Sequence, residues 1–229
     1  MPHQPALRRP GRHCLALTSL HAFGGPLAEH CAAGYGGGIV VWGVGSGARP
    51  VAAPAAPRAV WKAHDSLVTA LHRSAHGLHL LSGAADGGVH LWSMKVKPAA
   101  PLATFRHAGG VAGVHHLNET TLVAAAGDGV SVWDMRHAAA PRATVRLDGR
   151  AVGALAVSPF GDAAAVATAG GGLFAVDLLD PGLAAAAVAA APLPQPVTAL
   201  AWNTATGEVV AGSAEGRVRV YKQRQPGYV

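Results

Sequence analysis

The sequence is poor in several kinds of side chain that proteins use for cores and for catalysis. Aromatic residues make up 5% and charged residues 13% of its 229 residues, and Asp and Glu together number 12. With so few aromatic rings, Ala and Val must fill the interior between short pieces of regular structure. The sequence contains no GxSxG, DxD or HExxH motif. We therefore expect a protein that is not an enzyme.

Cysteine is almost absent, which limits both disulfides and zinc sites. Cys14 and Cys31 are the only two, and they form neither a disulfide framework nor a metal-binding spacing. They are typical of small buried side chains in a reducing compartment. Histidine is more frequent, but His115 and His116 are adjacent, and neighbouring residues of a strand point to opposite faces. The sequence predicts no metal site.

No apolar segment is long enough to cross a membrane. The longest run, residues 183–191, is mostly Ala and is closed by Pro192, which favours a loop or an edge segment. Residues 1–13 form a basic N-terminal tail without the apolar segment of a secretory signal. We expect a soluble protein of the cytoplasm, the nucleus or both, with no membrane partner.

One stretch imitates a cofactor site. Residues 39–48 read as a strand followed by glycines in the spacing of a dinucleotide-binding turn. Such a turn works only when a helix begins at the glycines and points its amides at the pyrophosphate. Pro50, Pro54 and Pro57 forbid that helix. We expect no bound cofactor.

Glycine (30) and proline (16) are abundant, and they punctuate a repeat. Residues 63–94 contain a histidine, three short apolar runs and a tight turn, which predicts a three-strand meander with room for a fourth strand. The same order recurs four more times. The third runs end at positions that follow one another at intervals of about 40 to 50 residues, close to the spacing of propeller blades. These positions are Trp42, Trp92, Trp133, Val176 and Tyr221.

Runs such as LHLL and TLVAAA are apolar without alternation, as expected of strands that are covered on both faces. The sequence predicts an all-β propeller with about five four-stranded blades, a flexible loop over 44–59 and a C-terminal tail over 225–229. The predicted blades span residues 14–43, 60–97, 104–138, 144–180 and 188–223.

The segments 86–92 and 128–134 resemble the blade endings of the WD40-repeat family. The resemblance implies a buried, hydrogen-bonded tetrad of His64, Ser82, Asp86 and Trp92 in the second blade. It implies a partial tetrad of His107, Asp128 and Trp133 in the third, where Ala124 replaces the serine. Neutral histidine, a hydroxyl and an indole can satisfy one another in such a chain.

Five blades are fewer than members of this family usually have. The ring is then compact and closed, or it is open or incomplete. Further strands in residues 1–13 and 43–60, a truncated chain, or strands supplied by a partner would each account for the number. A closed ring needs its first and last blades joined, since bare sheet edges seek other strands.

The resemblance implies a scaffold that binds other proteins of a stable complex. A second reading is a substrate receptor of a cullin-4 ubiquitin ligase, because Trp133–Arg136 reads WDxR. A third is an RNA-binding propeller, given the net charge of +6, although no stacking aromatics accompany the basic residues and nucleic acid is not the favoured partner. The candidate docking residues are Asp134, Arg136, Arg217 and Arg219.

Overall fold

The computed structural model describes residues 17–23, 29–44, 57, 59–95, 100–183, 185–187, 195–203 and 205–222. Regular structure in these residues consists of β-strands, which form five antiparallel sheets. Within the same residues, no helix is long and apolar enough to cross a membrane.

The strands follow one another along the chain in each sheet. The first sheet contains β1 (Leu17–Phe23), β2 (Glu29–Tyr35), β3 (Gly38–Val44) and β4 (Ala59–Lys62), and the second contains β5 (Val68–Arg73), β6 (His79–Ala84), β7 (Gly88–Ser93) and β8 (Ala103–Arg106). The third contains β9 (Val111–His116), β10 (Thr121–Ala126), β11 (Gly129–Asp134) and β12 (Ala143–Arg146). The fourth contains β13 (Val152–Val157), β14 (Ala163–Thr168), β15 (Leu173–Asp177) and β16 (Ala185–Ala187), and the fifth contains β17 (Val197–Trp202), β18 (Val209–Ser213) and β19 (Val218–Tyr221).

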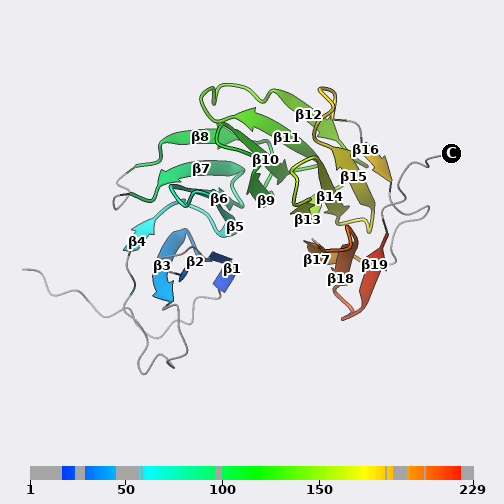
Figure 1. Ribbon diagram of the computed structural model, residues 1–229, viewed down its shortest axis with the longest axis horizontal. Coiled ribbons are helices and arrows are strands. Elements are labelled where there is room, and N and C mark those ends of the chain that lie inside the picture. The colour runs from blue at the N-terminus through cyan, green and yellow to red at the C-terminus, as the bar shows by residue number, and fades with distance from the viewer. Residues whose placement is uncertain are drawn as a thin grey trace, which may run out of the picture.

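The five sheets stand side by side in an arc, with the first and fifth sheets on the two sides of its opening (Figure 1). The first strand of each sheet is innermost, and β5, β9, β13 and β17 line one central hollow. In the described residues the ring is therefore not closed. The prediction of an all-β propeller is confirmed, and the alternative of a compact closed five-blade ring is wrong.

The core lies between neighbouring sheets. Leu81 and Phe105 of the second sheet pack with Val114 and Leu122 of the third. Val123 and Val130 of the third sheet pack with side chains of the fourth. The middle strands are buried along almost their whole length, which explains why their sequences do not alternate.

Glycine turns fasten each of the first three sheets to the next. Gly87 adopts a φ of 81°, which a residue with a side chain rarely tolerates. Its carbonyl accepts a hydrogen bond from the His107 amide at 3.0 Å. The carbonyls of Gly36 and Gly127 bind Val68 and Val152 in the same way, each at 2.7 Å. The turn between the second and third strands of one sheet therefore positions the start of the next sheet.

The sheet boundaries differ from the predicted blade ranges by one strand. β4, β8 and β12 pair with the strand before them and complete the first, second and third sheets. The predicted blades that begin at residues 60, 104 and 144 assign these segments to the following unit. The described part of the fifth sheet has three strands. Residues 1–13, 45–56 and 225–229 lie outside the described part of the chain.

Candidate functional site

Three of the four residues expected in the tetrad are joined in the second sheet. His64, at the start of the sheet, lies with its Nε2 2.7 Å from the Ser82 hydroxyl of β6. The indole Nε1 of Trp92 in β7 donates to the same oxygen at 2.8 Å. The hydroxyl accepts from the indole, and it can either donate to the histidine nitrogen or accept from it, so both tautomers of a neutral ring fit this contact. Burial lowers the pKa of His64 to about 4.

Asp86 does not belong to this chain of hydrogen bonds. Its carboxylate is exposed and accepts from the Gly88 amide at 2.9 Å, so it caps the turn between β6 and β7. The Nδ1 of His64 is buried and has no hydrogen-bond partner. The expectation of a buried carboxylate is wrong, because the turn points Asp86 toward solvent.

The third sheet joins two of its three expected residues directly. The Nε1 of Trp133 donates to the Nε2 of His107 at 3.0 Å, without a bridging hydroxyl. The Nδ1 of His107 is 3.2 Å from the Gly87 carbonyl, so the ring proton belongs on Nδ1. Asp128 instead lies 3.5 Å from the guanidinium of Arg146. The partial tetrad is therefore a histidine–indole pair.

The fourth sheet contains a polar pair that the sequence analysis missed. Asp148 precedes its first strand by four residues, as His64 and His107 precede theirs. Its carboxylate accepts from the buried hydroxyl of Thr168 at 2.8 Å. The shared position four residues before the first strand is the sequence signal that could have revealed Asp148. These polar contacts tie the segment before the first strand of the second, third and fourth sheets to later strands of the same sheet.

Residues 55–93 match the family model described as "WD domain, G-beta repeat". Two solved structures share the arrangement of sheets. The C-terminal WD40 domain of Sif2 has a TM-score of 0.67 and 19% identity over 86% of this chain, and the β-propeller domain of Cps50 (Swd1) from Myceliophteria thermophila has a TM-score of 0.63 and 17% identity over 88%. The chain has the fold of a WD40 β-propeller. No curated protein matches it.

The chain spans only part of the length of these structures. The chain covers 55% of the Sif2 domain and 67% of the Cps50 domain. Both likenesses are below 25% identity, so they show the fold alone. The repeat match coincides with the residues that carry the most complete polar chain, His64, Ser82 and Trp92.

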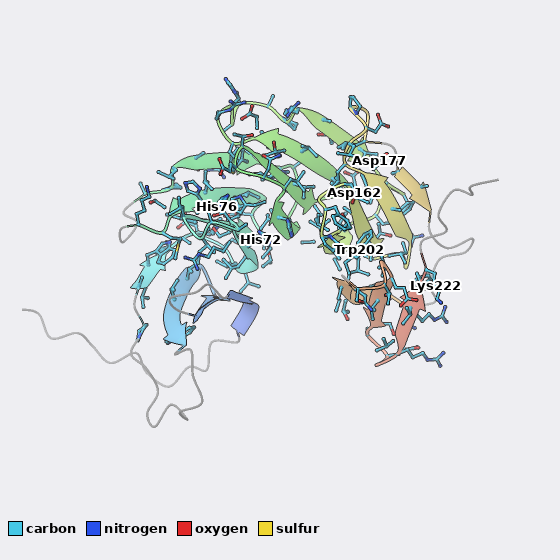
Figure 2. All side chains as sticks on the ribbon, in the orientation of Figure 1. His72, His76, Asp162, Asp177, Trp202 and Lys222 are labelled. Atoms are coloured by element: carbon cyan, nitrogen blue, oxygen red, sulfur yellow. The ribbon has the colours of Figure 1, made fainter. Side chains whose placement is uncertain are left out.

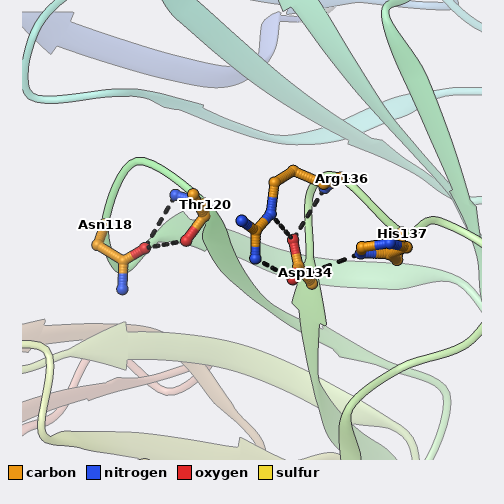
Figure 3. Close-up of polar contacts among 5 residues, drawn as sticks. All are labelled: Asn118, Thr120, Asp134, Arg136 and His137. Atoms are coloured by element: carbon orange, nitrogen blue, oxygen red, sulfur yellow. Dashed lines mark hydrogen bonds and ion pairs between the residues drawn. The ribbon is translucent and has the colours of Figure 1, made fainter.

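Arg136 of the WDxR segment pairs with the carboxylate of Asp134 in the same segment (Figure 3). Its Nε and Nη2 contact the two carboxylate oxygens of Asp134 at 2.9 and 2.7 Å, and the Arg136 amide donates to the same carboxylate. These contacts hold the pKa of Asp134 well below its usual range. The Arg136 side chain is 67% exposed, but its Nε and Nη2 donors already bond the Asp134 carboxylate.

Arg217 and Arg219 lie on the last sheet of the arc. Both side chains are exposed, and they line one shallow hollow together with Glu215, whose carboxylate is 3.6 Å from the Arg217 guanidinium. Figure 2 shows Trp202 on the inner strand of this sheet and Lys222 just after its outer strand. Arg217 and Arg219 therefore lie at an outer edge of the fifth sheet, whereas Arg136 follows β11 of the third sheet.

The two faces of the fifth sheet differ in their surroundings. One face packs Val197, Ala211 and Tyr221 against the fourth sheet. The strand register places Val210, Val218 and Val220 on the opposite face with two alanines. Val218 is 68% and Val220 56% exposed. We call this apolar surface, formed by Ala199, Ala201, Val210, Val218 and Val220, the terminal face.

No group of three or more His, Cys, Asp or Glu side chains in the described residues is arranged to hold a metal ion. Several buried polar side chains, among them Ser82, Trp92 and Thr168, are instead hydrogen-bonded within their own sheets. WD40 propellers are typically non-enzymatic, and they generally bind other proteins. The exposed apolar and basic side chains of the terminal sheet are therefore the functional candidates.

Proposed function

We propose that the protein is a non-enzymatic scaffold of the cytoplasm or nucleus that binds other proteins of a stable complex. The terminal face carries this proposal. A sheet face in a propeller is ordinarily covered by the next blade, and here Val218 and Val220 have no such cover among the described residues. Apolar side chains gathered on one accessible face favour protein association.

The proposed partner supplies β-structure that continues the arc. Among the described residues β19 is the outer edge of its sheet, which leaves its backbone groups to a strand of the partner. Arg217 and Arg219 at this edge are exposed, and their like charges oppose pairing between two copies of the strand. A partner strand with acidic side chains opposite these arginines would be complementary.

Affinity purification from a native extract tests the scaffold function. The double variant Val218→Asp/Val220→Asp should lose the co-purified proteins by at least about tenfold, since charge on the terminal face prevents apolar contact. Leu67→Asp, which changes an exposed leucine away from that face, is the matched control and should keep them. Equal recovery by both variants would contradict docking at the terminal face.

The ligase reading is a second proposal that rests on the WDxR segment alone. The pairing of Arg136 with Asp134 means that a partner carboxylate must share or displace this contact. Arg136→Ala should leave the fold intact, because the side chain is exposed, and should abolish recovery of the ligase adaptor. Unchanged adaptor recovery removes this motif from the proposal.

RNA binding is the least supported proposal. Nuclease treatment of the purified complex separates it from the others: loss of partners after treatment supports RNA, and a nuclease-resistant set supports the scaffold. The basic side chains of the fifth sheet are the candidate contacts for phosphate, and binding through them should weaken steeply with added salt.

A further inference from the structure

The two most exposed large apolar side chains of the described residues lie on one rim of the fourth sheet. Phe160, in the turn between β13 and β14, is 89% exposed, and Leu179, just after β15, is 75% exposed. The Leu178 amide donates to the Asp162 carbonyl at 2.8 Å, so the two turns that carry these side chains are adjacent. Apolar side chains that gather on an accessible surface favour association, and the terminal face does not include these two.

A hollow of about 390 Å³ opens beside Leu179, and alanines of β14, β15 and β16 line it. The strand register places Ala163 and Ala175 on the same face of the sheet as Ala167 and Leu173. Ala167 and Leu173 pack against the fifth sheet, but no described residue of the fifth sheet lines the hollow. One end of this face is therefore covered and the other is open. We call the open end the fourth-sheet hollow, which is lined by Asp162, Ala163, Ala175, Asp177, Leu179 and Ala186.

The interior of the fourth-sheet hollow is apolar and its mouth is acidic. Ala163 and Ala175 are half-buried, whereas Asp162, Asp177 and Leu179 are exposed. Figure 2 shows the two aspartates close together on the fourth sheet. The Oδ1 of Asp162 accepts from a serine hydroxyl of its turn, and the Oδ1 of Asp177 accepts from the Leu179 amide at 2.9 Å. The Oδ2 of each carboxylate has no such bond in the described part of the chain.

The charge at this mouth is opposite to that of the whole protein. The chain has a net charge of +6, yet residues 151–216 contain no Lys, Arg or His. Asp162 and Asp177 form no ion pair with a described side chain, whereas Glu208 and Glu215 each pair with a basic side chain of the fifth sheet. The overall charge of the protein repels a basic partner, so attraction of such a partner must come from a local acidic surface.

We propose that the fourth-sheet hollow binds a basic segment of a second partner protein. An apolar side chain of the segment enters between the alanines and contacts Leu179, and the arginine or lysine side chains that flank it pair with Asp162 and Asp177 at the mouth. The exposed carboxylates meet groups that stay near the solvent, and the apolar interior meets an apolar group. The terminal face, with Arg217 and Arg219 beside it, suits an acidic strand, so the two surfaces bind different segments.

NMR titration of the full chain with short peptides tests the hollow. The probe is acetyl-Gly-Arg-Leu-Arg-Gly-amide, and its two counterparts replace both arginines with glutamate or the leucine with serine. The methyl resonances of Leu179 and Ala175 should shift saturably with the probe. At low salt, the probe should bind at least about fivefold more tightly than either counterpart. The Val218→Asp/Val220→Asp variant, in which the terminal face is altered, should bind the probe as the wild type does.

Variants of the hollow test its residues directly. Asp162→Asn/Asp177→Asn should weaken binding of the probe at least about fivefold, while asparagine keeps a side-chain oxygen for the turn donors. Asp65→Asn/Asp128→Asn changes the net charge equally at the second and third sheets and should leave the affinity unchanged. Leu179→Ser should weaken binding about threefold, since it removes an apolar contact. Unchanged urea midpoints show that these variants are folded.

Several outcomes would overturn the proposal. Equal binding of the glutamate counterpart would remove the charge preference, and equal binding of the serine counterpart would leave an ionic contact that does not use the hollow. The same loss in Asp65→Asn/Asp128→Asn would reduce the effect to overall charge. Shifts of the Leu179 resonances with protein concentration alone would assign the hollow to a second copy of the chain, and no saturable shift would exclude the site. Because the terminal-face variant is measured alongside, none of these outcomes decides docking at the terminal face.

Discussion

At the level of single side chains, the second and third sheets each give a buried indole N–H an acceptor, but they do so differently. In the second, Ser82 stands between Trp92 and His64. In the third, where alanine replaces the serine, the indole of Trp133 reaches His107 directly. The histidine is neutral in both, since burial lowers its pKa. The serine is therefore one of two solutions to the same requirement.

Ser82→Ala should destabilise the protein more than Asp86→Ala. Loss of the hydroxyl leaves the Trp92 indole and the His64 ring unpaired in a buried site, which costs about 1–3 kcal/mol. Asp86 is exposed and caps one amide, so its loss should cost under about 1 kcal/mol. Urea unfolding of the two variants measures both. An equal or larger effect of Asp86→Ala would restore the carboxylate to the tetrad.

At the level of strands and sheets, neighbouring blades approach so closely that some positions admit no side chain. A Cβ added to Gly113 of β9 would lie 2.6 Å from the Cβ of Leu155 on β13. Neither atom is at the end of a flexible chain, so the backbones themselves must move apart. Glycine at this position is therefore required by the contact between the third and fourth sheets.

Gly113→Ala should destabilise the protein by about 1–3 kcal/mol, as overpacking in a dense core does. Gly182→Ala is the control, because an added Cβ there meets its nearest atom at 3.6 Å and the glycine has no positive φ. Thermal unfolding should show a lower Tm for the first variant and little change for the second. A normal Tm for Gly113→Ala would mean that the inner strands can separate freely.

The sequence predicted the middle strands well and the outer strands poorly. The ends of the third strands, among them Trp92, Trp133 and Val176, are buried where the repeat places them. The outer strands β4, β8 and β12 have four residues each and mix apolar with basic side chains. Such short segments have no periodicity of their own, and only pairing with the preceding strand defines them.

The candidate site was predictable only in part, for a related reason. Motifs revealed His64, Ser82 and Trp92, but they also suggested Asp86, whose direction depends on the turn. The terminal face arises from the cross-strand register of β17, β18 and β19. The terminal face is exposed because no described sheet covers it, and the order of residues in the sequence does not show which sheets become neighbours.

At the scale of the whole molecule, buried neutral histidines link stability to pH. His64 and His116 have pKa values of about 4 and about 3 when folded, below the value near 6.5 of the unfolded chain. Their stabilisation is complete above pH 6.5 and is lost as the pH falls, because the unfolded state then binds protons that the folded state excludes. By pH 5 the loss should be about 2 kcal/mol for each histidine.

Urea midpoints between pH 7 and pH 5 measure this dependence. His116→Phe removes one of the two groups and should give a shallower decline than the wild type, whatever its effect on stability at pH 7. A decline of the same slope in this variant would mean that His116 is protonated in the folded protein.

The open arc also predicts how the isolated protein behaves. With the terminal face uncovered, the chain expressed alone should be oligomeric or prone to aggregation, and it should become monodisperse with its partner. Size-exclusion chromatography with light scattering measures this directly. A monodisperse monomer that unfolds cooperatively without a partner would contradict the need for a partner to cover the terminal face.

In the described residues each sheet packs on its neighbours along the arc, so the arc is close to a one-dimensional stack with two ends. The second, third and fourth sheets have a described sheet on both sides, whereas the first and fifth have one on a single side. Opening should therefore begin at the ends and progress inward, and amide exchange should be slowest in β10 and β14 and fastest in the terminal sheets. A protein bound to the fifth sheet would turn that end into an interior position and slow its exchange first.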